Sequence, residues 1–282
     1  MISLVQLGTV DYATGLRLQR ELVDLRKQEK VGDVLLLLEH SPVITLGRNA
    51  KTANVVASPE LLTQRGVEVF ECDRGGDVTF HGPGQIVGYP IFDLRGHATT
   101  EGKRKTLGAV EFVRRLEEVL IRTCADFAIP TKRVPELTGV WTDAASHDAH
   151  GATAASAVQK GEASKPAGAA ESKLAAIGVH ISRSVTSHGF ALNVNTDLSF
   201  FSLIIPCGIT SKPVTSMQQE LGKALDLIAV AESISRNFGM VFSSQMLWVE
   251  TLDALLGRSV GVPMKPPEEL RQLHKEDGTA WG

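Results

Sequence analysis

A cysteine in a turn is the first candidate for chemistry. Cys207 lies between Pro206 and Gly208, directly after the apolar residues 203–205. Most lone cysteines on apolar segments are buried and unreactive. A thiol becomes a nucleophile near neutral pH only where a neighbouring cation or base favours the thiolate. Cys207 is therefore a candidate nucleophile on the condition that a lysine or a histidine lies beside it in the fold.

Lys173 is the candidate partner of this thiol. It begins the apolar run 174–177, which predicts an ammonium group at the edge of the core. A lysine at such a place more often extends its charged end into solvent. Small residues in two nearby segments either line a narrow channel for an acyl chain or mark places where a sheet meets a helix. These small residues are Ala176, Gly178, Gly189 and Ala191.

A third segment is rich in glycine. Residues 74–84 contain four glycines together with Arg74 and His81. Glycine lets a backbone approach a ligand closely, so this segment is a candidate binding loop. It is not a phosphate-binding loop, because no Gly-Lys-Ser/Thr follows and Gly75-Gly76 precedes a strand rather than a helix. The alternative is a tight hairpin in which the His81 side chain is satisfied by its neighbours.

Length and charge restrict the kind of protein that carries these residues. The 282 residues allow one substantial core, and a net charge of −3 argues against a protein that coats nucleic acid. Three cysteines without Cys-x-x-Cys spacing argue against a disulfide framework or a zinc site. We see no signal peptide and no apolar run long enough for a bilayer, so we expect a cytoplasmic protein without membrane partners. Basic clusters at 103–105, 114–115 and 132–133 face either solvent or an acidic protein partner.

The elements that must position these residues mix helices and strands without a regular βαβ repeat. This pattern favours an α/β domain of the α+β kind with a mixed sheet over a Rossmann fold. The periodicity predicts helices at 11–29, 59–64, 106–127, 224–238 and 245–256. Strands are expected at 3–7, 33–38, 43–46, 67–70, 86–92, 137–142, 174–182, 186–195 and near 202–205.

One stretch interrupts this pattern just before Lys173. Residues 143–172 hold eleven alanines and Val158 as the only larger aliphatic residue. Such a composition buries too little apolar surface to offset the entropy of ordering, so we predict a disordered insertion. We expect residues 1–257 to form one catalytic domain and residues 258–282 to be a tail outside its core.

Taken together, the three segments resemble the lipoyl(octanoyl) transferase family, the octanoyl-acyl carrier protein:protein N-octanoyltransferases. Each motif is weak alone, but the order is that of the family and the similarity extends from about Val5 to about Leu256. The matching stretches are Arg74-Gly75-Gly76, His81-Gly82-Pro83-Gly84-Gln85, Gly88-Tyr89-Pro90, Gly139-Val140-Trp141, Lys173 to Val179, His188 to Val194, Asp197-Leu198 and Pro206-Cys207-Gly208.

The resemblance implies a biotin/lipoate protein ligase-like fold, in which a mixed sheet surrounds an acyl tunnel. It also implies that octanoyl-acyl carrier protein acylates Cys207, whose thiolate Lys173 favours, without ATP or metal. Backbone N–H groups near Cys207, or the side chain of His81, would stabilise the oxyanion. The implied substrate-binding residues are Arg74, Gly75, Gly76, Asp77, Val78, Thr79, Phe80, His81, Ala176, Ile177, Gly178, Gly189, Phe190 and Ala191.

The partners implied by the resemblance are other proteins. The acceptors would be lysines on the lipoyl domains of 2-oxoacid dehydrogenase E2 subunits and on glycine cleavage H protein, and the enzyme would act as a monomer. Three alternatives stay open: an ATP-dependent lipoate or biotin ligase of the same fold, a non-catalytic binder of acylated proteins, and a thioesterase that uses the thiol.

The chain departs from the family pattern in two places. The insertion at 143–172 separates Trp141 from Lys173, where the family has a short link. Loop closure becomes only slowly less favourable with length, so Lys173 keeps its place if the ends of the insertion stay close. Asp77 stands where the family more often has a neutral residue, and its carboxylate either tunes the pocket or faces solvent.

Overall fold

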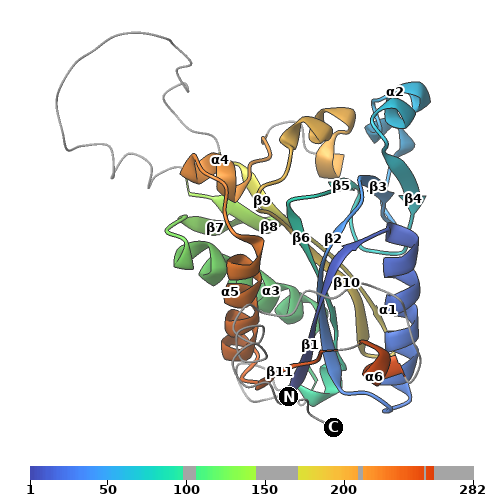
Figure 1. Ribbon diagram of the computed structural model, residues 1–282, viewed down its shortest axis with the longest axis vertical. Coiled ribbons are helices and arrows are strands. Elements are labelled where there is room, and N and C mark those ends of the chain that lie inside the picture. The colour runs from blue at the N-terminus through green and yellow to red at the C-terminus, as the bar shows by residue number, and fades with distance from the viewer. Residues whose placement is uncertain (98–105, 144–170, 209–211, 251, 257–282) are drawn as a thin grey trace, which may run out of the picture.

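The computed structural model describes residues 1–97, 106–143, 171–208, 212–250 and 252–256. Within these residues an eight-stranded mixed sheet forms the centre of the fold (Figure 1). Its strands, in spatial order, are β11 (Met246–Trp248), β1 (Ile2–Val10), β2 (Asp33–His40), β6 (Gln85–Ile91), β10 (Val185–Asn193), β9 (Lys173–Ser182), β8 (Leu137–Thr142) and β7 (Thr131–Val134).

The sheet is parallel at one edge and antiparallel elsewhere. β1 runs parallel to both β11 and β2, whereas every pairing from β2 to β7 is antiparallel. A second sheet of three strands packs near the start of β6, with β3 (Val43–Leu46) between β4 (Glu68–Glu71) and β5 (Val78–His81). β5 belongs to the small sheet and β6 to the main sheet, and residues 82–84 of the glycine-rich segment join the two strands.

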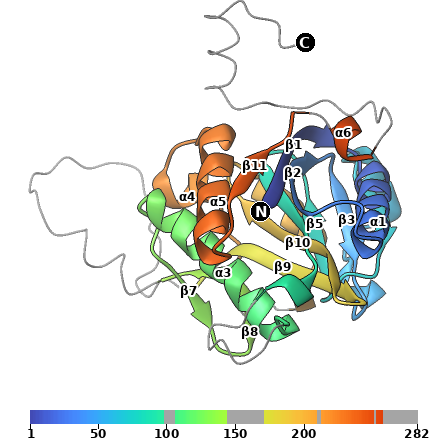
Figure 2. The same ribbon diagram turned by 90° about the horizontal axis from the view of Figure 1, so that it is seen from below.

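Helices cover both faces of the main sheet. α1 (Tyr12–Lys27) lies on one face, and α3 (Ala109–Asp126) and α5 (Leu227–Val241) lie on the other (Figures 1 and 2). The unbroken run of leucines in β2 reflects this double cover, since alternate side chains enter different cores. Leu35 and Leu37 pack with α3 and α5, while Leu36 and Leu38 pack with α1.

The ends of the helices follow local sequence signals. Asp11 caps α1 by accepting a hydrogen bond from Thr14 N at 2.8 Å, and Ser58 caps α2 (Pro59–Gln64), which has Pro59 in its first turn. No helix among the described residues is long and apolar enough to cross a bilayer. The remaining elements are η1 (Thr52–Asn54), η2 (Leu94–Gly96), η4 (Leu198–Leu203), η5 (Pro206–Gly208), α4 (Met217–Leu221) and α6 (Leu252–Leu256).

Two predicted elements are wrong. The strand expected near 202–205 is the 3₁₀ helix η4, and only Ile204 makes a single bridge, to Val55. The helix expected at 245–256 is divided into β11 and α6, because residues 246–248 complete the free edge of β1. The sequence pattern also missed β7, a short edge strand.

The predicted insertion at 143–172 lies outside the described residues except at its two ends, and the predicted tail at 258–282 lies wholly outside them. The two ends meet. Thr142 N donates to Ser172 O at 2.9 Å, and Lys132 Nζ binds both Asp143 and Glu171, at 3.1 and 2.9 Å. β8 and β9 are therefore paired although the insertion separates them in the sequence, and Lys173 lies opposite Trp141.

Candidate active site

A narrow cavity of about 50 Å³ runs along β6, β9 and β10. Only alternate residues of β6, Val87 and Tyr89, line it, whereas β9 and β10 contribute consecutive residues around Gly178 and Gly189. Twelve of the predicted substrate-binding residues surround this one cavity: Arg74, Gly75, Gly76, Asp77, Thr79, His81, Ala176, Ile177, Gly178, Gly189, Phe190 and Ala191.

The other two predicted residues, Val78 and Phe80, are buried on the opposite side of β5. Successive side chains of a strand alternate in direction, so Thr79 and His81 face the cavity while Val78 and Phe80 do not. The ring of Phe80 stacks on Phe200 with 4.7 Å between centroids. Val78 and Phe80 therefore belong to the core of the small sheet.

Glycine at 178 allows two backbone segments to touch. A methyl group there would lie 2.5 Å from Gly75 O, and Gly75 N donates to Val179 O at 3.1 Å. The glycine-rich segment is thereby held against β9, and the backbone itself forms the wall. All four small residues, Ala176, Gly178, Gly189 and Ala191, line the cavity, and the close neighbour of Gly178 is the backbone of the glycine-rich segment rather than a helix.

Four residues that line the cavity were not among the predicted site residues: Tyr12, Val87, Tyr89 and His188. Period-two spacing from Gln85 would have indicated Val87 and Tyr89, and His188 directly precedes a predicted binding residue. Nothing near Tyr12 in the sequence indicated a role, because α1 brings this side chain from a distant part of the chain.

Lys173 lies beside an adjoining hollow. This hollow shares Thr79, Ala176 and Ala191 with the cavity and is also lined by Lys173 and Pro206. Pro206 is in the same turn of η5 as Cys207. The structure thus brings the segment that carries the cysteine to the hollow beside Lys173, whereas the Cys207 side chain is outside the described part and its distance to Lys173 stays a prediction.

Lys173 is held firmly and is only 9% exposed. Its N–H donates to Pro213 O at 2.8 Å, and its carbonyl accepts from Thr215 N at 3.0 Å. Its Nζ lies 5.1 Å from the centroid of the Trp141 ring, which is a cation–π contact. On the other side Gly139, with a φ of +122°, leaves room for the lysine stem, because a methyl group there would lie 3.0 Å from Lys173 Cε.

Asp77 fixes the turn that carries Cys207. Its Oδ2 accepts a hydrogen bond from Asn54 Nδ2 at 2.5 Å, and Asn54 O accepts from Ile205 N at 2.7 Å. Oδ1 accepts from Lys51 N at 3.1 Å. Asp77 therefore has a structural role besides lining the cavity, since its hydrogen bond to Asn54 connects the glycine-rich segment to the residue that precedes η5.

A chain of buried hydrogen bonds connects His81 to the backbone of Lys173. Asn193 Nδ2 donates to Thr215 O at 3.0 Å, which leaves its Oδ1 to accept from Gln85 Nε2 at 2.8 Å. Gln85 Oε1 therefore faces His81 Nδ1, at 2.7 Å, and must accept the proton of that nitrogen. The chain ends at Thr215, whose N–H binds Lys173 O.

This chain of hydrogen bonds, together with burial, determines which proton His81 carries. Burial first, and then the nearby charges of His40 and Arg74, lower the pKa of His81 to about 3, so the ring is neutral at neutral pH. Its one N–H is used by Gln85, and its Nε2 faces the hydroxyl of Thr45 at 3.5 Å. His81 therefore presents an acceptor and has no second N–H to offer an oxyanion.

Arg74 brings a buried positive charge to the cavity. Its side chain donates to Thr45 O at 2.6 Å, to Thr45 Oγ1 at 2.9 and 3.0 Å, and to Gly75 O at 3.1 Å. All of these acceptors are neutral. Arg74 is 8% exposed, and burial strengthens its electrostatic influence on the groups around it.

Metal ligands are not clustered in the part of the chain that the structure describes. No three His, Cys, Asp or Glu residues there are placed to hold one ion.

Comparison with known proteins identifies the family of the chain. Residues 11–239 match the lipoyl protein ligase A/B catalytic domain. The chain is 57% identical to the octanoyltransferase of Koribacter versatilis over 98% of both chains, and 52% identical to that of Acidobacterium capsulatum over 91% of this chain and 96% of the relative. The chain belongs to the lipoyl protein ligase A/B family. The predicted family and the predicted class of enzyme, an acyltransferase, are thereby confirmed.

Solved structures of lipoate protein ligases show the same fold. Lipoate-protein ligase A bound with ATP superposes with a TM-score of 0.59 at 13% identity, covering 99% of this chain and 96% of that one. The bipartite lipoate protein ligase of Thermoplasma acidophilum gives a TM-score of 0.57 at 13% identity, covering 91% of each chain. The predicted ligase-like α/β fold with a mixed sheet is confirmed.

Proposed function

We propose that this member of the family transfers an octanoyl group from octanoyl-acyl carrier protein to a lysine of a lipoyl domain, through a thioester on Cys207. The observation that carries the proposal is the shared hollow, because Lys173 and the turn of Cys207 border it and it adjoins a narrow cavity. Octanoyltransferases are also the relatives that match nearly the whole chain.

In the first step the Cys207 thiolate attacks the carbonyl carbon of the donor thioester. A new C–S bond forms, the bond to the phosphopantetheine sulfur breaks, and the ammonium of Lys173 supplies the proton that the departing thiolate takes up. The donor and the acyl-enzyme are both thioesters, so the step needs neither ATP nor a metal to activate the acyl group.

In the second step the amine of the acceptor lysine attacks the Cys207 thioester. The C–N bond of the amide forms, the C–S bond breaks, and Lys173, now neutral, removes the extra proton from the amine. The Cys207 thiolate and the charged Lys173 are restored together. The backbone N–H of Cys207 is the better candidate for the oxyanion, since Pro206 has no N–H, Gly208 N already donates to Ile205 O at 3.1 Å, and the N–H of His81 is used by Gln85.

Incubation with octanoyl-acyl carrier protein in the absence of ATP tests the proposal. We expect one octanoyl group per protein by intact mass, released by hydroxylamine, and no thioester on Cys207→Ser. A lipoyl domain added afterwards should gain the group as an amide. Strict dependence on ATP would indicate an acyl-adenylate ligase, and release of free octanoate would indicate a thioesterase.

The predicted acceptors, the lipoyl domains of E2 subunits and H protein, are part of the same proposal. A cytoplasmic location and a monomeric state stay predictions.

A further inference from the structure

The cavity along β6 meets a second hollow at a single histidine. This outer groove, of about 280 Å³, lies between α1 and the ends of β9 and β10. Leu16 and Val23 of α1 form part of its wall, and His180 lines it from β9. His188 lines both the groove and the cavity, so its imidazole stands between them.

His188 is at the end of the cavity that is farther from Lys173. Along β10, Asn193 lines the hollow of Lys173, Ala191 lines both hollows, and His188 lines only the far part. On β6, Gln85 lines the hollow of Lys173, and Val87 and Tyr89 line the cavity. The cavity therefore follows the strands from Lys173 toward His188. The four residues from Gln85 to Tyr89 correspond to about 13 Å along β6.

His188 is held in this place by three contacts, two of its ring and one of its backbone. Its Nε2 donates to Asp73 Oδ1 at 2.8 Å, and the ring meets Tyr89 edge-on with 6.5 Å between centroids. The backbone N–H of His188 donates to Gln19 Oε1 at 2.7 Å. With a φ of +56°, His188 is in a conformation that residues other than glycine adopt rarely, so the surroundings hold it there.

We propose that the His188 imidazole closes the acyl cavity and sets the longest acyl chain that the protein accepts. The inference rests on the proposed function, since it identifies which part of that site limits the chain. An acyl chain bound with its carbonyl beside Lys173 extends along β6 and β10 until it meets His188. Without the imidazole, the chain would continue into the outer groove past Leu16 and Val23.

His188→Gly tests this inference, because glycine suits the backbone conformation and removes the whole side chain. Initial rates of acyl-enzyme formation are measured by intact mass with carrier protein that bears octanoyl, decanoyl, dodecanoyl or tetradecanoyl groups. We expect the ratio of dodecanoyl to octanoyl rates to rise by about tenfold or more, since each additional buried methylene is favourable.

His180→Ala is the matched control. His180 also faces Asp73, at 3.6 Å, and lines the outer groove but not the cavity. It should keep the wild-type ratio. An unchanged ratio in folded His188→Gly, or an equal change in His180→Ala, would overturn the proposal. If His188→Gly fails to fold, His188→Asn gives the same test with a shorter side chain that also tolerates positive φ.

A binding measurement separates this inference from the proposed function. Titration calorimetry with free octanoate and dodecanoate needs no acyl transfer. If wild type forms no acyl-enzyme with any chain, the proposed function fails, yet a gain in dodecanoate affinity by His188→Gly still supports the closed end. Equal dodecanoate affinity in the two proteins contradicts it.

Discussion

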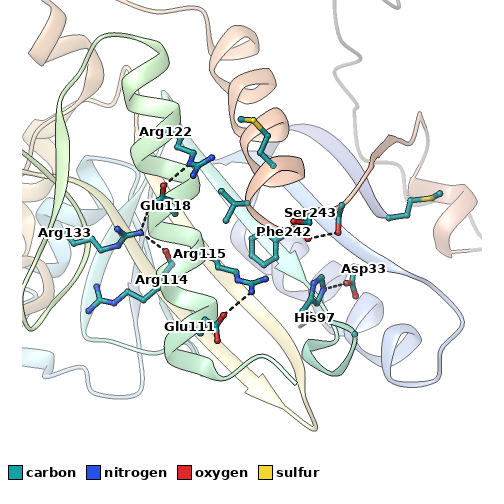
Figure 3. Close-up of a pocket in the computed structure, with 15 residues that line it drawn as sticks. Asp33, His97, Glu111, Arg114, Arg115, Glu118, Arg122, Arg133, Phe242 and Ser243 are labelled. Carbon is teal, nitrogen blue, oxygen red and sulfur yellow. Dashed lines mark hydrogen bonds and ion pairs between the residues drawn. The ribbon is translucent and has the colours of Figure 1, made fainter. Parts of the chain in front are cut away.

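The groove between α3 and α5 and the cavity along β6 differ in size and in the way their charges are balanced. The groove has a volume of about 800 Å³ against about 50 Å³ for the cavity, and it is lined by Asp33, the first residue of β2, together with residues of α3 and α5 (Figure 3). Its arginines pair with carboxylates: Arg115 with Glu111 at 3.1 Å, Arg122 with Glu118 at 2.9 Å, and Arg133 with Glu118 at 2.8 Å.

Arg74 and His81, which line the cavity, have neutral partners instead, whereas His188 at its far end donates to the carboxylate of Asp73. Arg74 binds hydroxyl and carbonyl oxygens, and His81 is held neutral by burial and by Gln85. Partly exposed ion pairs contribute little to stability, whereas buried polar groups with hydrogen-bond partners are held in one arrangement. Volume is therefore a poor guide to chemistry in this protein, and the satisfaction of buried groups is a better one.

The largest expected effect is on transfer. Lys173→Ala should reduce the rate of acyl-enzyme formation on the order of 10²-fold or more. The Cys207 thiolate then lacks the nearby cation that favours it, and the departing thiolate lacks its proton donor. Lys212→Ala is the control, since Lys212 also lies over the Trp141 ring, at 5.8 Å, but does not line the hollow. Similar rates for the two variants would mean that charge near Trp141, rather than Lys173, supports the reaction. The rates are measured by quenched-flow mass spectrometry.

Acid should lower the free energy of unfolding through two buried histidines before it protonates the carboxylates of the groove. These histidines are His81, which lines the cavity, and His40, whose Nε2 lies 2.6 Å from the hydroxyl of Tyr89. Burial lowers the pKa of His40 to about 4 and that of His81 to about 3, from an ordinary 6.5. The unfolded chain therefore binds protons that the folded chain does not, and stability present above pH 6.5 is lost toward pH 4. The free energy of unfolding should fall by up to about 1.4 kcal/mol per pH unit for each histidine. Urea titrations at intervals from pH 7 to pH 4 measure it.

The carboxylates of the groove respond in a lower range. The pKa of Asp33 is below its usual 3.8, because hydrogen bonds from His97 and Arg26 outweigh the opposing effect of burial. Protonation of Asp33 thus begins to cost stability only below about pH 4. A free energy of unfolding that stays flat from pH 6.5 to pH 4 would contradict the predicted neutral histidines.

Removing one member of the buried hydrogen-bond chain should lower the free energy of unfolding more than removing one ion pair of the groove. Gln85→Leu leaves the buried atoms His81 Nδ1 and Asn193 Oδ1 without their hydrogen-bond partner, so we expect a loss of about 2 kcal/mol in the free energy of unfolding. Arg122→Ala removes one pair whose arginine side chain is 48% exposed, and we expect a change below about 0.5 kcal/mol. Equal losses in urea unfolding would remove the distinction between the two regions.

The smallest effect is expected from the insertion. Deletion of residues 144–170 should leave the rate of octanoyl transfer within about twofold, because Thr142 and Ser172 already bond and Lys132 joins Asp143 to Glu171. The control is the same deletion with Lys132→Ala, in which the ends lose their common partner. A large loss of transfer by the folded deletion protein would show that the insertion shapes the site.

Local patterns were sufficient for the long elements and for the segments that line the cavity. The capped α2 and the strand β2 lie where the sequence placed them, because Ser58-Pro59 and an unbroken apolar run are strong local signals. Short edge elements were missed or misplaced. β11 has three residues and exists because β1 offers a free edge, so no periodicity within residues 246–248 could reveal it.

The amino-acid sequence by itself determined which residues are available for the reaction and their order: a thiol in a turn, a lysine at the start of an apolar strand, and a glycine-rich loop. It also determined which chain segments alternate between two cores, since side-chain direction on a strand has a period of two residues. The tertiary structure alone decided which groups meet. Pairing of β6, β9 and β10 brings Gln85, Lys173 and Asn193 to one hollow, and packing of α1 places Tyr12 and the outer groove beside His188. Such contacts depend on strand register and helix packing between distant parts of the chain, which spacing in the sequence does not encode.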